Sequence, residues 1–238
     1  MPQTSIRENL LRLRERIARA AARAGHRPEE VTLVSVSKTQ PATAIREAYE
    51  AGVRHFGENR VQEWEGKRAG TDGLTATWHL IGHLQSNKAA RAAKLFHSVD
   101  SVDDFALAQK LGRTRAESNA PGKLRVLLEV HLAPEATKTG VEIVALPYLA
   151  QRVAALPHLD LAGLMCIPPF IGPVEAGLQP GAVRPYFRRL RDLRDDLAKE
   201  TRLSLPVLSM GMSHDFEVAI EEGATEIRVG AALFGPRP

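Results

Sequence analysis

One lysine and two glycine-containing segments have residue types that could do chemistry together. Lys38 follows an apolar run in VSVSKTQ, while residues 210–214 (MGMSH) and 228–232 (RVGAA) lie at the ends of two other short apolar runs. A lysine among apolar strand ends has a lowered pKa, because burial disfavours its charged form, and its neutral amine attacks aldehydes. Glycines let backbone N–H groups approach a phosphate, and Ser213 adds a hydroxyl. The combination suits a phosphorylated aldehyde held at both ends, although a solvated loop lysine and ordinary turn glycines are the alternatives.

Arg228 adds a third group to this pattern. Pyridoxal 5′-phosphate (PLP) is a phosphorylated aldehyde with a pyridine ring, and the partner of its ring nitrogen sets the electronic character of the ring. An arginine is always charged and only donates hydrogen bonds, so it favours an unprotonated nitrogen and a weaker electron sink. The alternative is an arginine whose head pairs with Glu226 or Glu58 inside the fold.

The elements that would position these residues alternate between strand and helix. Ser5 and Glu8 form the capping-box pattern S-x-x-E, which predicts a first helix that ends at Gly25. Apolar and β-branched runs then predict strands, with helical patterns between them. The strands are expected at residues 31–37, 55–57, 77–81, 96–99, 124–132, 161–166, 207–210 and 226–229. The helices between them are expected at about residues 41–51, 61–69, 87–95, 103–118, 143–156, 183–201 and 216–222.

This alternation predicts one α/β domain over residues 1–238, folded as a single TIM-type (β/α)8 barrel. Residues 1–26 precede the first strand, so they are expected to form an extra N-terminal helix packed on the barrel. Active sites of such barrels lie at the C-terminal ends of the strands, which places Lys38 and Ser213 on one face. The Pro- and Gly-rich residues 168–181 follow the sixth strand, and they are expected to form a loop or lid over that face.

Composition and charge argue against several other classes of protein. The chain of 238 residues has a formal charge of only +4 and no dense basic patch, so nucleic-acid binding is not expected. No apolar run is long enough to span a bilayer, and the first residues lack the apolar core of a secretory signal, so we expect a cytoplasmic protein without membrane contact. Cys166 is the single cysteine and is expected to be a packed thiol. His79 and His83 are predicted on a strand and in the following loop, on no common face, so no metal site is expected.

The segment WHLIGHLQSNK, residues 78–88, resembles the signature of the pyridoxal phosphate homeostasis protein family, whose barrels are similar to the N-terminal domain of alanine racemase. VSVSKTQP, HFGENRVQE, GLMCIPP, LSMGMSHDFEVAIEEG and IRVGAALFG resemble the same family in order and spacing. The resemblance implies that Lys38 carries PLP as a Schiff base, that Asn59 lies near the ring and that Arg228 faces the pyridine nitrogen. It also implies that the phosphate is held by the segments after the last two strands. The predicted cofactor-binding residues are Lys38, Asn59, Met212, Ser213, Arg228, Gly230 and Ala231.

Two segments depart from the pattern of that family. Family members usually have a threonine where Ala231 stands, so this chain lacks one hydroxyl, and the resemblance implies weaker phosphate binding. After the fifth strand the family usually has an asparagine and a Ser/Gly-rich turn, whereas this chain reads HLAPEATKTG, with His131 and Pro134. Lys138 in this segment is either a second basic group at the barrel mouth or a solvated loop lysine.

Three functions fit these residues. The resemblance favours a PLP-binding protein that buffers or delivers the cofactor without substantial catalysis, with PLP-requiring apoenzymes as transient partners. A PLP-dependent amino-acid racemase and a PLP-independent Schiff-base aldolase are the alternatives. Racemisation needs a second base opposite the lysine, but Tyr49, Tyr148 and Tyr186 all fall in or near predicted helices outside the barrel. The chain ends just after the eighth strand, so the second domain of the racemases is expected to be absent and the protein is expected to be a monomer.

Overall fold

The chain begins with a helix that lies on the outside of a barrel. The computed structural model describes residues 5–118, 120–132, 139–169 and 180–235. Helix α1 (Ile6–Arg23) starts at Ser5, whose hydroxyl accepts a hydrogen bond from the Glu8 amide, while the Glu8 carboxylate accepts one from the Ser5 amide. The apolar stripe of the helix is buried against the body of the protein; it comprises Leu10, Leu13, Ile17, Ala20 and Ala21. The predicted capping box and the extra N-terminal helix are therefore confirmed.

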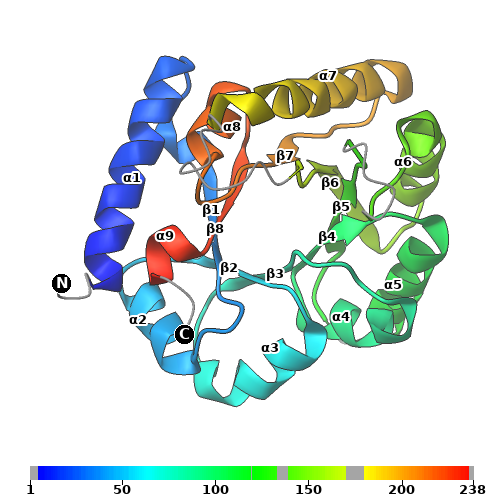
Figure 1. Cartoon of the computed structure of the whole chain (residues 1–238). Helices are drawn as coiled ribbons and strands as arrows, with labels where there is room; N and C mark the ends of the chain where they lie inside the picture. The colour runs from blue at the N-terminus through cyan, green and yellow to red at the C-terminus, as the bar shows by residue number, and fades with distance from the viewer. Residues whose placement is uncertain (1–4, 119, 133–138, 170–179, 236–238) are drawn as a thin grey trace.

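The strands of the described residues form one closed parallel barrel, in which each strand pairs with its neighbours in the sequence and the last strand pairs with the first. Figure 1 looks into this ring of strands, with the helices arranged around its outside. The strands are β1 (Thr32–Val36), β2 (His55–Glu58), β3 (Thr77–Leu80), β4 (Ser98–Val102), β5 (Leu124–Glu129), β6 (Leu159–Met165), β7 (Val207–Ser209) and β8 (Glu226–Val229). The predicted (β/α)8 barrel is confirmed.

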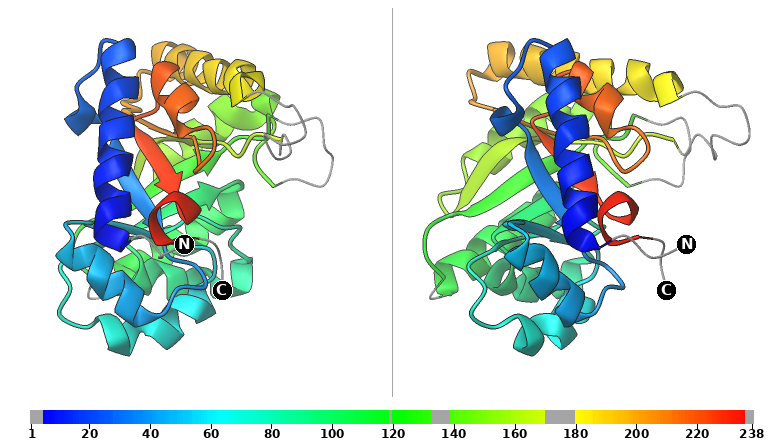
Figure 2. Two further views of the ribbon diagram at one scale, coloured as in Figure 1. Left: turned by 60° about the vertical axis from the view of Figure 1, so that its left-hand side comes forward. Right: turned by 90° about the vertical axis from the view of Figure 1, so that its left-hand side faces the viewer.

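The helices that connect the strands cover the outer surface of the barrel, and the two further views show α1 lying across the side of the ring of strands (Figure 2). They are α2 (Ala42–Glu50), α3 (Val61–Arg68), α4 (Ala89–Leu95), α5 (Phe105–Glu117), α6 (Leu146–Ala154), α7 (Arg184–Thr201) and α8 (Phe216–Glu221). Short 3-10 segments precede or follow some of them, at Pro28–Glu30, Ala69–Thr71, Ser86–Lys88, Ile143–Ala145 and Pro180–Val183. No helix of the described residues is long and apolar enough to cross a membrane.

Two elements differ from the sequence prediction. Strand β4 was expected at residues 96–99, but Phe96 ends helix α4 and the strand runs over Ser98–Val102. A search for apolar runs misses this strand because several of its residues are polar, even though all of them are buried. A short helix after the last strand, α9 (Ala231–Phe234), was not expected. Four residues are too few to show a helical periodicity, and the GAA sequence there looks like a plain turn.

The apolar core lies mainly between the strands and the surrounding helices. Two smaller apolar clusters lie apart from it, one made of Val34, Val36 and Ile81 and the other centred on Leu127 and Met165. Val34 and Val36 are two residues apart on one strand, so they share a face. This face is the one that turns into the barrel, toward the site described next.

Candidate functional site

A cavity of about 460 Å³ opens at the C-terminal ends of the strands, which is the face expected to hold the site. Every residue predicted to bind the cofactor lines it, although these residues come from four different strand ends. Lys38 comes from the β1 end and Asn59 from the β2 end. Met212 and Ser213 come from the β7 end, and the β8 end contributes Arg228, Gly230 and Ala231. The sequence prediction therefore selected residues that the fold brings into one place.

The loop after β3 packs tightly against the backbone of Asn59, which is one of the residues that line this cavity. A Cβ atom added to Gly82 would lie only 2.5 Å from the Asn59 carbonyl oxygen, so a side chain at this position would push the two loops apart. Gly82 and Asn59 both line the cavity. The glycine in WHLIGHLQ thus has a local structural reason, which is the close approach of two backbone segments.

Two hydrogen bonds to buried partners hold the guanidinium group of Arg228 in place. One guanidinium nitrogen donates to Ser209 Oγ and the other to the Cys166 carbonyl oxygen, each at 2.8 Å. Only 4% of Arg228 is exposed. The pairing with Glu226 or Glu58 that was considered from sequence is not what the structure shows, because Glu226 pairs with Arg125 and Glu58 with Lys67. The guanidinium is therefore a fixed positive charge in the wall of the cavity.

The Cys166 side chain is fully buried beside this arginine, as expected for a packed thiol. Burial raises the pKa of its thiol to about 12, because the charged form would lie away from water. The positive charge of Arg228 opposes this effect without outweighing it. A thiol in this state is a poor nucleophile, so Cys166 serves the packing of the site rather than its chemistry.

Backbone N–H groups converge on one oxygen atom at the β7 and β8 ends. The Gly230 amide donates to Ser213 Oγ at 3.3 Å, and the Ala232 amide points to the same oxygen at 3.5 Å. The loop before them is fixed by the Met212 amide, which donates to the Asp215 carboxylate at 2.5 Å. Converging amides of this kind favour anions, including phosphate. The phosphate cradle at these two strand ends stays a prediction, and the amides that converge here lie at the start of α9 rather than at the helix of residues 216–221.

Several cavity residues were missed by the sequence prediction. They are Val36, Gln40, Ile81, Gly82, His83, Ile167, His214 and Gly235. Among these residues, His83 has its Nδ1 atom 3.7 Å from the carboxylate of Asp103. The strand-end rule could have found His83 and His214, since each follows a predicted strand, but the four-residue spacing of His79 and His83 pointed only to the question of a metal pair.

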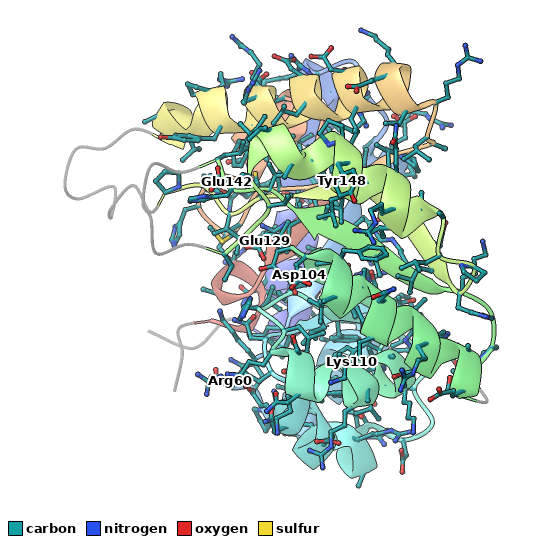
Figure 3. The ribbon with its side chains drawn as sticks, turned by 90° about the vertical axis from the view of Figure 1, so that its right-hand side faces the viewer. Arg60, Asp104, Lys110, Glu129, Glu142 and Tyr148 are labelled. Carbon is teal, nitrogen blue, oxygen red and sulfur yellow. The ribbon has the colours of Figure 1, made fainter. Side chains whose placement is uncertain are left out.

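The loop after β5 was expected to be unusual, but most of it falls outside the described residues. Pro134 and Lys138 lie in residues 133–138, and most of the predicted lid, residues 170–179, lies outside as well. At the edge of this segment, Thr139 donates a hydrogen bond of 3.1 Å to Glu129. Glu129 ends strand β5 deep in the fold, whereas Glu142 lies nearer the mouth (Figure 3). Burial raises the pKa of Glu129, so its proton is held more tightly than usual.

His79 does not share a site with His83, as predicted, but it has other partners inside the barrel. Its Nδ1 lies 3.1 Å from the buried Asp100 carboxylate, and its Nε2 lies 3.0 Å from His55. With Glu226 these groups could be mistaken for metal ligands. However, the Arg125 guanidinium already donates to Glu226 at 2.8 Å and lies 3.8 Å from Asp100. A cation of the protein itself thus neutralises part of the charge of this cluster.

Comparison with known proteins places the chain among PLP-related barrels. Residues 9–238 match the family described as alanine racemase, N-terminal domain. A pyridoxal phosphate homeostasis protein of Aquifex aeolicus is 44% identical over 230 residues, covering 97% of each chain. One of Pseudomonas aeruginosa is 46% identical over 234 residues, covering 98% of this chain and 96% of the relative.

Solved structures show the same pattern. PipY of Synechococcus elongatus PCC7942, solved with PLP bound, is 41% identical with a TM-score of 0.84, covering 97% of this chain and all of that one. An alanine racemase of Clostridium difficile 630 is 14% identical with a TM-score of 0.72, and the match covers 98% of this chain and 57% of the racemase. At this identity the racemase shares the fold, and nothing about its activity follows for this chain.

Proposed function

This chain belongs to the family of pyridoxal phosphate homeostasis proteins, which carry the alanine racemase N-terminal domain, and we propose that it binds PLP as a Schiff base on Lys38 to buffer or deliver the cofactor. One observation carries the proposal. A single cavity brings Lys38 from the β1 end together with converging amides from the β7 and β8 ends and with the fixed charge of Arg228. These groups match the aldehyde, the phosphate and the ring of PLP.

The residues have distinct tasks in this proposal. PLP supplies an aldehyde and an electron-accepting ring when it is bound. Lys38 would hold the cofactor through a C=N bond to the aldehyde carbon, with the carbonyl oxygen released as water. The Gly230 and Ala232 amides, with Ser213, bind the phosphate. Arg228, whose charge is fixed by Ser209 and Cys166, disfavours a protonated ring nitrogen and so keeps the ring a weak electron sink.

A carrier without substantial catalysis fits the site better than a racemase does. Racemisation needs a second base on the opposite face from the lysine, and the tyrosines of this chain are far from that place. Tyr49 lies on α2, Tyr186 on α7, and Tyr148 on the outer surface of α6, where 66% of it is exposed (Figure 3). None of them is among the described residues that line the cavity.

A PLP-dependent amino-acid racemase or related enzyme is the second candidate, because His83 and His214 line the cavity and could move protons. Our proposal for the carrier includes three further points. Residues 1–238 act as one domain, the protein works in the cytoplasm as a monomer, and its partners are PLP-requiring apoenzymes that it meets transiently.

Borohydride reduction of the purified protein tests the assignment of Lys38. The protein loaded with PLP should be yellow, and reduction should fix the cofactor on the peptide that contains Lys38. A Lys38→Ala variant should stay colourless, whereas Lys110→Ala, which removes an exposed lysine of α5, should behave as the unmodified protein. An equally yellow Lys38→Ala variant, with no labelled Lys38 peptide in the unmodified protein, would refute the site. Racemisation of a common amino acid at roughly 1 per second or faster would reject the carrier function.

A further inference from the structure

The turn that carries Lys38 has an unfavourable backbone conformation. Thr39, the next residue, has φ of 64°, in the left-handed region that β-branched residues avoid. Such a conformation is unfavourable, because the Cβ atom comes too close to the following carbonyl oxygen. It therefore persists only where the surrounding contacts hold it. The Gln40 amide closes the turn by donating to the Ser37 carbonyl oxygen at 3.0 Å.

One ion pair on helix α3 holds this turn on both sides of Lys38. Lys67 Nζ donates to the Ser37 carbonyl oxygen at 2.8 Å and to Glu63 Oε1 at 2.6 Å. The same Glu63 oxygen accepts a hydrogen bond of 2.5 Å from the Thr39 amide. The residue before Lys38 and the residue after it are thus bound by two side chains that are one helical turn apart. We call Lys67 and Glu63 the α3 clamp.

A buried carboxylate anchors the clamp to the barrel. Glu58 at the end of β2 is fully buried, and its two carboxylate oxygens lie 3.1 and 3.2 Å from Lys67 Nζ. Ser37 Oγ donates to the same carboxylate at 2.6 Å. Burial raises the pKa of Glu58, and the hydrogen bond from Ser37 and the charge of Lys67 oppose that effect. The Lys67 ammonium group therefore donates hydrogen bonds to Glu58 of β2, to the Ser37 carbonyl oxygen of the turn and to Glu63.

The clamp lies outside the cofactor cavity, since neither Glu63 nor Lys67 lines it, although Gln40 lines both that cavity and a neighbouring hollow. This hollow of about 480 Å³ opens beside the clamp, and it is lined by Thr39, Gln40, Pro41, Glu63 and Lys67 among others. The Lys67 side chain is 12% exposed and that of Glu63 27%. Burial acts to raise the pKa of Glu63, but its hydrogen bonds with Lys67 and the Thr39 amide outweigh burial, so the pKa lies below its usual range. Glu63 is consequently ionised under ordinary conditions.

From these contacts we infer that Glu63 and Lys67 are positioning residues for Schiff-base formation on Lys38. The inference rests on the proposed function of Lys38. The clamp fixes the peptide units on either side of Lys38, so the amine enters the cavity along one direction when it condenses with the aldehyde and releases water. Fixing a nucleophile within about an ångström of its reactive position changes rates by roughly 100-fold. Neither clamp residue lines the cofactor cavity itself, so both act through the turn.

The test compares two glutamates of the same helix. Glu63→Ala removes the acceptor of the Thr39 amide but leaves Lys67 with Glu58, so the fold keeps its buried pair. Glu65→Ala is the matched control, because it removes only the ion pair of 3.3 Å with Arg91. Glu63→Gln keeps an oxygen that can accept from the Thr39 amide and should rescue part of the effect. Lys67→Met is the second clamp variant.

The readout separates positioning from a merely structural role. Schiff-base formation with PLP is followed by its visible absorbance, and binding of pyridoxine 5′-phosphate, which has an alcohol in place of the aldehyde, is followed by calorimetry. We expect Glu63→Ala to slow Schiff-base formation roughly 10- to 100-fold and to leave the affinity for pyridoxine 5′-phosphate unchanged. Glu65→Ala should change neither quantity.

Three results decide the matter. If Glu63→Ala and Lys67→Met form the Schiff base as fast as the unmodified protein, the inference is wrong. It is also wrong if both ligands lose affinity equally, because that result describes a general loosening of the fold. An unmodified protein without a borohydride-labelled Lys38 defeats the proposed function first, and that failure is visible before any clamp variant is made.

Discussion

Replacing Ala231 with threonine should strengthen the binding of PLP through its phosphate. Ala231 is the first residue of α9, it is exposed, and it lines the cavity directly after the Gly230 amide that points to Ser213 Oγ. A hydroxyl at this position would stand beside the converging amides. Because the site already offers N–H donors, the new group adds one donor without changing the charge of the cavity.

The expected gain follows from the cost and strength of one hydrogen bond. A hydrogen bond to a charged group contributes about 1.5–3 kcal/mol. Ordering the new side chain costs about 0.5–1.5 kcal/mol. With the midpoints of both ranges, the net gain for Ala231→Thr is about 1.2 kcal/mol, which corresponds to a dissociation constant lower by roughly 8-fold.

An Ala231→Val variant provides the matched control, since valine has the shape of threonine without the hydroxyl and a similar effect on a short helix. Equilibrium titrations would compare PLP with pyridoxal, which lacks the phosphate, for both variants. We expect Ala231→Thr to gain affinity for PLP alone and Ala231→Val to gain for neither ligand. Equal behaviour of the two variants, or an equal gain for pyridoxal, would refute the placement of the phosphate beside Ala231.

Two further predictions concern groups whose pKa burial changes. Cys166, with a pKa raised to about 12, should not react with a thiol-directed reagent in the native protein and should react fully after unfolding; fast native labelling would contradict the burial of this side chain. Burial and the neighbouring His79 lower the pKa of His55 to about 4. The unfolded chain, with a pKa near 6.5, therefore binds this proton first, and stability should fall as pH decreases from about 6.5 to 4. Urea unfolding of His55→Gln should show a flatter pH profile over that window, and an unchanged slope would count against the assignment.

The barrel could be predicted from sequence because each strand and helix carries its own local signal. Alternation of apolar runs with helical patterns gives the element order, and the strand-end rule then selects Lys38 and Ser213 without any knowledge of contacts. Strand β4 was misplaced because three of its five residues, Ser98, Asp100 and Ser101, are polar and yet buried. Burial there depends on partners such as Arg125, which is distant in the sequence.

The parts of the site that sequence did not predict depend on contacts between segments. The α3 clamp joins residues that are 24 and 30 positions apart in the sequence. No local sequence pattern around Glu63 or Lys67 indicates that they hold the turn beside Lys38. The hydrogen-bond partners of Arg228 were likewise not predictable, since one is Ser209, 19 residues away, and the other is the Cys166 carbonyl group, 62 residues away. Local sequence patterns identify the candidate reactive groups, whereas the residues that hold those groups in place can be identified only from contacts in the three-dimensional structure.

The α3 clamp connects the turn that we propose bears the cofactor to the outside of the molecule. A protein that docked over the hollow beside Glu63 and drew this carboxylate into an ion pair of its own would release the Thr39 amide without entering the cavity. Where such docking lowers the equilibrium affinity for PLP, and not only the rate of Schiff-base formation, the effect is reciprocal, and bound PLP lowers the affinity for the partner by the same factor. Contact at α3 and loading at Lys38 would then oppose each other, which is the behaviour that handing over a cofactor requires.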